Sequence, residues 1–190
     1  MRDDSIDRLQ VGDITVRIEY DTNPESPREW SNLGTMVCWH RRYSLGDGKP
    51  ECSPSEFNPN EHAVCLPLYL FDHSGITMRT SPFSCPWDSG QVGWIYCDRE
   101  TILKEYSRKR LYKALLAKVE RVLESEIKAY DEYLTGQVYG FIVEDAEGNH
   151  LDSCWGFYGL DYCRQEGKAS AEHWRKEHAK TDKMLQEVTA

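Results

Sequence analysis

The sequence predicts an α+β fold, in which an antiparallel sheet has helices packed on one face. Runs typical of β-strands fill the first half of the chain, whereas helical spacing of apolar residues begins only near residue 109. A parallel sheet would need crossover helices between the early strands, and no helical pattern occurs there. With 190 residues, 39% of them hydrophobic, the chain has the size of one ordinary domain, so we expect a single domain over residues 1–190.

The strands are predicted from two patterns. Residues 14–20 alternate between apolar and polar side chains, as a strand with one solvated face does. Short apolar runs bounded by turn residues predict the other strands, and Glu147-Gly148-Asn149 separates the last two as a hairpin turn. These runs cover residues 35–40, 66–71, 76–78, 92–97, 138–143 and 150–155. Repeated glycine, proline and asparagine predict an irregular loop at about 44–64.

Helices are predicted in the second half of the chain. Asp98 suits the N-cap of a short helix that begins at Arg99, and a longer helix extends from about Lys109 to Gly136, a residue typical of C-terminal caps. Apolar residues three or four apart give the longer helix one buried stripe, which consists of Leu111, Leu115, Val119, Val122, Leu123, Ile127, Tyr130 and Leu134.

A further, C-terminal helix is predicted from Leu160, but its large apolar side chains are few. They are Cys163, Trp174, Leu185 and Val188. A weakly amphipathic helix gains little from packing. We therefore expect a helical tail at about 167–190 that frays or depends on a partner.

Composition excludes several classes of protein. The 32 Asp and Glu residues outnumber the 23 Lys and Arg residues, which gives a net charge of −9 and a pI of about 5.2. Direct binding to nucleic acid depends on neutralising phosphates, so we expect none. No apolar run approaches the roughly 20 residues of a membrane-spanning helix, and residues 1–5 lack the pattern of a signal peptide. We therefore expect a cytoplasmic protein that does not bind membranes.

The seven cysteines do not form a disulfide or metal-binding pattern. Their spacing is irregular and no C-x-x-C pair occurs, which predicts mostly reduced thiols in the core. The closest metal-like pairs are Cys38-x-His40 and His62-x-x-Cys65, and the completing ligands would be His73, Cys85 and Cys97. Structural zinc sites commonly combine two close pairs, so we expect neither a metal nor another cofactor.

One set of residues suggests an enzyme. Cys85 lies in a turn between two predicted strands, with His73 twelve residues earlier and Asp88 three residues later. A thiolate that a histidine activates and a carboxylate orients is a recognised nucleophile. A cysteine-dependent or metal-dependent enzyme that uses the Cys85 region is therefore the alternative hypothesis. It is the less favoured one, because no nucleophile-elbow or phosphate-loop motif accompanies these residues.

The acidic residues are unevenly distributed. Residues 99–118 carry seven Lys or Arg against two Glu, whereas residues 119–163 carry ten Asp or Glu against two cations. On the long helix, Glu120, Glu124 and Asp131 project within about 40° of one another, and their spacing could imitate a row of phosphates. The alternative is an ordinary solvated face. The predicted partner-binding carboxylates are those of Glu120, Glu124, Asp131, Glu132, Glu144, Asp145 and Glu147.

Five ordered motifs resemble a family of small proteins that phages and other mobile elements encode. They are SPREW followed by NLGTM at 26–36, LYLFDHSG at 68–75, SCPWDSGQVG at 84–93, YLTGQVYG at 133–140 and DSCWGFYG at 152–159. The resemblance extends to about residue 166, and the polar tail beyond departs from the pattern. It carries over no catalytic or binding residue.

The resemblance implies an accessory role in the conflict between a mobile element and its host. Inhibitors of CRISPR or restriction systems are common in that setting. Together with the charge pattern, it predicts a small acidic inhibitor that binds a nucleic-acid-binding defence protein of the host, with mimicry of nucleic acid as one way of doing so.

Overall fold

The computed structural model describes residues 5–189, without the side chains of residues 182, 183 and 185–189. The chain folds into two compact units. The first, which we call the terminal unit, combines residues 5–25 with residues 136–189. The second, the inserted unit, is Ser26–Thr135 and interrupts the first in the sequence. Each unit has a sheet and a hydrophobic core of its own.

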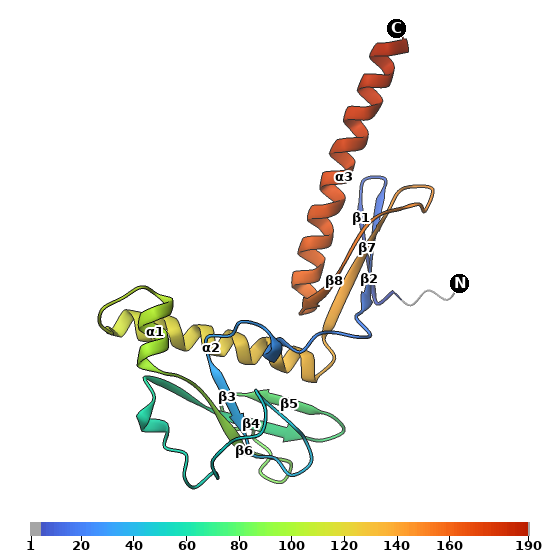
Figure 1. Cartoon of the computed structure of the whole chain (residues 1–190). Coiled ribbons are helices and arrows are strands. Elements are labelled where there is room, and N and C mark those ends of the chain that lie inside the picture. Colours follow the sequence, from blue (N-terminus) through green and yellow to red (C-terminus); the bar gives the residue numbers. More distant parts are fainter. Residues whose placement is uncertain (1–4, 190) are drawn as a thin grey trace. The chain divides into compact units, whose positions relative to one another are not determined.

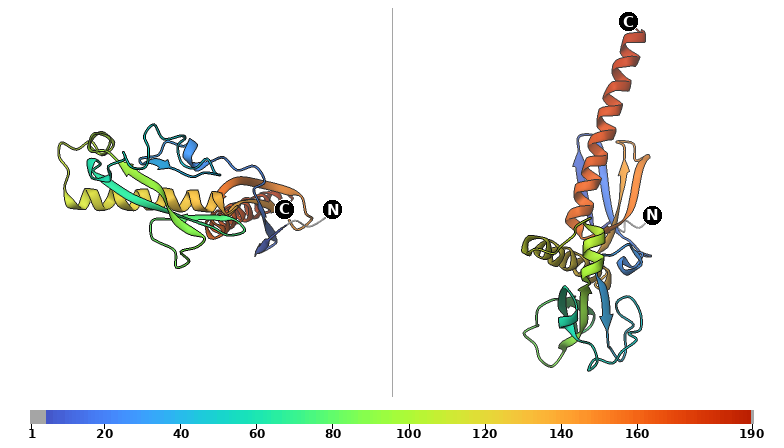
Figure 2. Two further views of the ribbon diagram at one scale, coloured as in Figure 1. Left: turned by 90° about the horizontal axis from the view of Figure 1, so that it is seen from below. Right: turned by 60° about the vertical axis from the view of Figure 1, so that its left-hand side comes forward.

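In the terminal unit, a four-stranded antiparallel sheet packs against one long helix (Figures 1 and 2). The strands are β1 (Asp7–Val11), β2 (Ile14–Tyr20), β7 (Val138–Glu144) and β8 (His150–Tyr158), in that spatial order, and the helix is α3 (Leu160–Thr189). Alternate residues of β2 and β7 face α3. A Cβ atom on Gly167 of α3 would lie 2.8 Å from Cγ1 of Val16, so the absence of a side chain there allows the close contact.

In the inserted unit, α2 packs against a second antiparallel sheet (Figure 1). The spatial order of its strands is β3 (Thr35–Cys38), β6 (Ser89–Cys97), β4 (Val64–Asp72) and β5 (Ile76–Arg79). The helices are α1 (Arg99–Glu105) and α2 (Lys113–Leu134), and η1 (Pro27–Glu29) and η2 (Pro59–Glu61) are short 3₁₀ turns. The buried side chains of α2 are Leu115, Val119, Leu123, Ile127 and Tyr130.

The predicted α+β class, with antiparallel strands and a C-terminal helix, is confirmed. The strands form two sheets instead of the one expected. The long helix begins at Lys113, four residues later than predicted, and Gly136 follows it with a φ of +71°. Asp98 is the N-cap of α1, but its carboxylate bonds Nδ1 of His62 at 2.7 Å instead of capping the helix. Strand β1 was not predicted, because Asp7–Val11 has little apolar character.

The structure bears on part of the prediction for the C-terminal helix. Residues 160–189 form α3, as expected, and the side chain of Cys163 is fully buried. Trp174 packs against the same core. The other two predicted anchors, Leu185 and Val188, lie outside the described side chains. The expectation of a single domain over residues 1–190 stays a prediction. No helix in the described part of the chain has the length and hydrophobicity needed to cross a bilayer.

A buried arginine organises one end of the inserted unit. The side chain of Arg28 in η1 is only 3% exposed, and its guanidinium donates to both carboxylate oxygens of Asp47, at 2.6 and 3.0 Å. It also donates to Glu126 of α2 at 3.1 Å and to the carbonyl oxygen of Gly34 at 2.7 Å. Burial alone would lower the pKa of Arg28, but hydrogen bonds and charges from Asp47 and Glu126 outweigh it, and the pKa is raised.

The two carboxylates also bind backbone groups. Asp47 accepts the N–H of Met36 at 2.8 Å, and Glu126 accepts the N–H groups of Leu33 and Gly34 at 2.7 and 3.2 Å. Arg28, Asp47 and Glu126 thus join η1, the start of β3, the turn after residue 45 and α2. We call this set the Arg28 network.

We predict that Arg28→Ala lowers the free energy of unfolding by about 3 to 5 kcal/mol, because it leaves two partly buried carboxylates without their cation. Arg28→Lys should cost less but remain destabilising, since an ammonium cannot reproduce the forked contact with Asp47. Urea unfolding measures both effects, and the exposed Arg121→Ala serves as the control. A cost below about 1 kcal/mol for Arg28→Ala would contradict the organising role.

The buried stripe of α2 yields a second prediction. Leu115 is 3% exposed, so Leu115→Ala should destabilise the protein by about 2 to 5 kcal/mol through lost burial and the cavity left behind. The exposed Ala117→Ser on the same helix is the comparison, expected to stay within about 0.5 kcal/mol of the wild type. Equal urea midpoints for the wild type and Leu115→Ala would contradict the packing of this face.

Candidate binding site beside strand β3

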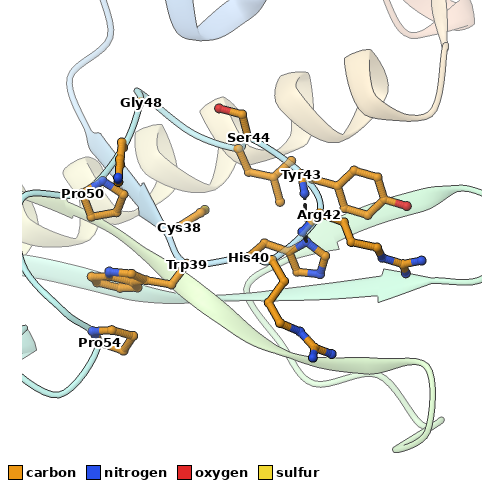
Figure 3. A pocket seen from close by; sticks show the side chains of 12 residues that line it. Cys38, Trp39, His40, Arg42, Tyr43, Ser44, Gly48, Pro50 and Pro54 are labelled. Atoms are coloured by element: carbon orange, nitrogen blue, oxygen red, sulfur yellow. Dashed lines mark hydrogen bonds between the residues drawn. The ribbon is translucent and has the colours of Figure 1, made fainter.

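A hollow of the inserted unit lies where the chain leaves β3 (Figure 3). It has a volume of about 590 Å³, within the range of small-molecule sites. Two segments form its walls, residues 38–45 and residues 48–54. Trp39, Pro50 and Pro54 lie at one end of this hollow, and Arg42 and Tyr43 lie at the other (Figure 3). We call it the Trp39 hollow.

Its lining has a local charge opposite to that of the chain as a whole. Arg41, Arg42 and Lys49 line the hollow, and none of the described Asp and Glu residues does. The aromatic rings of Trp39, His40 and Tyr43 contribute the remaining large surfaces. A site with these groups would attract an anion and offer flat apolar faces beside it.

The first wall is held by local hydrogen bonds and by the core. Nδ1 of His40 accepts hydrogen bonds from the backbone N–H groups of Arg42 at 3.3 Å and Tyr43 at 3.2 Å. The rings of His40 and Tyr43 stack with their centroids 4.9 Å apart. Leu45 is buried in the core at the end of this wall. Because Nδ1 accepts, the neutral imidazole carries its proton on Nε2.

The second wall is tied to the first across the sequence. The indole N–H of Trp39 donates to the carbonyl oxygen of Cys52 at 2.8 Å, and its ring meets Phe57 edge-on at 5.7 Å. Asp47, in the Arg28 network, donates its N–H to the carbonyl oxygen of Met36 at 3.0 Å. Both walls are therefore held by contacts within the chain.

A smaller hollow of about 380 Å³ adjoins the first and shares His40, Arg41 and Arg42 with it. Asp72 lines this smaller hollow and pairs with Arg42. The carboxylate of Asp72 also accepts a hydrogen bond from the hydroxyl of Tyr43 at 3.2 Å. The lining also includes Trp87, Asp88 and Ser89. Unlike the Trp39 hollow, this one combines both signs of charge.

Trp87 is almost entirely exposed, with 91% of its surface accessible. It lies in the turn at residues 85–89, which we call the Trp87 turn. The hydroxyl of Ser89 donates to the carbonyl oxygen of Cys85 at 2.5 Å, and the N–H of Asp72 donates to the carbonyl oxygen of Asp88 at 2.8 Å. One of these bonds closes the turn around Trp87, and the other fastens the turn to the end of β4.

The structure brings the three residues of the enzyme hypothesis together, but in an order unsuited to a nucleophile. Asp88 lies between the other two, with Oδ2 3.2 Å from Nδ1 of His73 and 3.7 Å from the sulfur of Cys85. A catalytic cysteine needs its histidine within hydrogen-bond reach. Among the described residues no hydrogen bond joins Cys85 and His73, so the carboxylate occupies the place of the base.

The seven predicted partner-binding carboxylates are divided between the two units. Four lie on α2 in the inserted unit, and the other three belong to the terminal unit. Only Glu120, Glu124 and Glu147 are exposed. Glu132 lies 3.8 Å from Lys128 and is partly buried, which raises its pKa.

The three remaining carboxylates have structural partners. Asp131 accepts the hydroxyl of Thr77 and the N–H of Met78, both at 2.7 Å, and so fastens β5 to α2. Glu144 bonds the guanidinium of Arg17 at 3.0 and 3.1 Å. Asp145 closes the β7–β8 turn by accepting hydrogen bonds from the side-chain amide and the backbone N–H of Asn149. These bonds also hold the pKa of Asp145 below its ordinary value.

The exposed surface of α2 is of mixed charge. Glu120 and Glu124 share it with Lys113, Lys118, Arg121 and Lys128, all of them exposed. The excess of acidic residues along this part of the sequence arises partly from Glu126, Asp131 and Glu132. Their carboxylates bond Arg28, Met78 and Lys128, respectively. The helix therefore shows no uniform row of carboxylates.

The residues with metal-like spacing have other surroundings in the structure. Cys38 is buried, and burial raises its pKa to about 12, with the nearby Asp47 adding to the effect. His62 bonds Asp98, and its ring lies tilted against that of Tyr96 with the centroids 3.8 Å apart. Within the part of the chain that the structure describes, no group of three or more metal-ligating residues converges.

Comparison with protein-family models, curated proteins and solved structures finds no match to this chain. The resemblance to phage-encoded proteins therefore stays a prediction.

The Trp39 hollow was not predicted as a site, although a signal for it was present. Trp39, His40, Arg41, Arg42 and Tyr43 are five consecutive aromatic or cationic residues, which begin within the strand predicted over residues 35–40 and continue beyond its end. Such a cluster at a strand end places binding groups on a loop held by a rigid element.

The burial of the thiols predicts their order of reaction. Burial raises the pKa of Cys38 and Cys163 to about 12 and that of Cys97 to about 11, so these thiols stay protonated at neutral pH. Iodoacetamide should therefore alkylate the exposed Cys154 first, and the three buried thiols only on unfolding. Peptide mass spectrometry over time measures the order. Alkylation of Cys85 faster than Cys154 would instead favour the enzyme hypothesis.

Proposed function

We propose that this protein acts by binding a protein partner, and that the contact is centred on Trp87. The single observation that carries the proposal is the 91% exposure of this indole. Tryptophan is enriched among the residues that dominate protein interfaces, and elsewhere it is highly buried on average.

The surroundings of Trp87 support an interface. Its turn is held by backbone and side-chain hydrogen bonds, so little ordering is needed on binding. Arg41, Asp72 and Asp88 provide a polar rim of both charges around the indole. We therefore expect a partner with an apolar pocket for the ring and charged groups at the edge of that pocket.

The identity of the partner follows from the resemblance to phage-encoded proteins. We expect a host defence complex of the CRISPR or restriction type, which the protein inhibits in the cytoplasm of the host cell. Nucleic-acid mimicry has less support than a Trp87 contact, because Glu120 and Glu124 lie among exposed cations on α2.

Plating of a sensitive phage tests the proposal. We expect expression of the chain in strains that each carry one defence system to raise phage plating in at least one strain. Trp87→Ala should abolish most of this protection, since loss of a central interface residue costs at least 2 kcal/mol, or about 30-fold in affinity. Tyr112→Ala, another exposed aromatic of the inserted unit, is the matched control.

Each outcome has a defined meaning. Full protection by Trp87→Ala would contradict the proposed contact, and no protection in any strain by the wild type would contradict the inhibitor role. Glu120→Lys with Glu124→Lys should leave protection intact. If this double variant loses protection while remaining folded by circular dichroism, the acidic face of α2 is the contact instead.

A further inference from the structure

We propose that the Trp39 hollow is a small-molecule site, and that its ligand is a planar aromatic compound bearing a phosphate, of the size of a mononucleotide. This site adjoins the Trp87 contact and shares Arg41 with its rim, but the proposal does not depend on that contact. The proposal follows from the volume of the hollow, the charge of its lining and the placement of its aromatic rings.

The charge of the lining indicates an anion. Arg41, Arg42 and Lys49 contribute three cations to a hollow without a carboxylate, in a chain whose net charge is −9. Asp72 already pairs with Arg42. The described residues form no ion pair with Arg41 or Lys49, so these two side chains are the ones available to a phosphate.

Two further groups of the lining, Cys38 and His40, carry no negative charge. Cys38 also lines the hollow, and its raised pKa of about 12 keeps the thiol neutral at physiological pH. The Nε2–H of neutral His40 remains a hydrogen-bond donor, because Nδ1 is engaged with the backbone of Arg42 and Tyr43. A phosphate or carbonyl oxygen would accept from it.

The aromatic groups indicate a planar ligand. Trp39 is held by its bond to Cys52 and its contact with Phe57, and Tyr43 is held by stacking on His40. Rings that are fixed before binding lose little entropy when a flat ligand lies against them. A volume of about 590 Å³ accommodates one such molecule, whereas the acidic chain repels an extended polyanion.

Isothermal titration calorimetry on the full chain tests this site. The probes are AMP, GMP, CMP and UMP, with adenosine and inorganic phosphate as the two halves of one of them. We expect at least one monophosphate to bind, and its nucleoside and phosphate each to bind at least tenfold more weakly. Equal affinity for the monophosphate and free phosphate would reduce the site to a surface anion site and overturn the proposal.

Two double variants locate the binding. Arg41→Gln with Lys49→Gln should weaken monophosphate binding at least tenfold, whereas Arg121→Gln with Lys128→Gln, which removes two exposed cations of α2, should leave it unchanged. Trp87→Ala should also bind normally, which separates this site from the proposed protein contact. Absence of heat for all four monophosphates up to about 5 mM, or equal losses in both double variants, would overturn the proposal.

Discussion

The forked contact between Arg28 and Asp47 is the interaction on which the inserted unit depends most. It neutralises a guanidinium that is almost fully buried, and the same two groups bind Gly34 and Met36 of the backbone. Asp47 stands between the two walls of the Trp39 hollow. The shape of the candidate site therefore depends on the ion pair between the buried Arg28 and Asp47. Arg28 also pairs with Glu126, which lies on α2.

The acidic composition of the chain gives a misleading impression of its surface. Several carboxylates serve the fold: Asp47 and Glu126 neutralise Arg28, Asp131 fastens β5, and Asp145 closes a turn. Each of these carboxylates is matched by hydrogen-bond donors within the chain. What remains for binding is a local arrangement, cations at the Trp39 hollow and an indole at the Trp87 turn, which the net charge does not reveal.

Local patterns in the sequence were sufficient to predict the helices and most strands, because the spacing of Leu115, Val119 and Leu123 reports directly which face is buried. The pairing of strands was not predictable in the same way. A strand pattern shows which side is apolar but not which partner it joins, so the division into two sheets was missed. Asp131 was assigned to the surface for a similar reason, since only the position of β5 reveals its bonds to Thr77 and Met78.

The interruption of the terminal sheet has a consequence for the order of folding. The β1–β2 hairpin and the β7–β8–α3 segment are each continuous in sequence, so both can assemble locally. Joining β2 to β7 instead closes a loop that contains the whole of Ser26–Thr135, and the entropic penalty of closure grows with the length of a flexible loop. Prior folding of that segment removes most of the flexibility. During synthesis β1 and β2 leave the ribosome long before β7, the second partner of β2, has been made. One edge of β2 therefore stays unpaired until the last third of the chain has emerged.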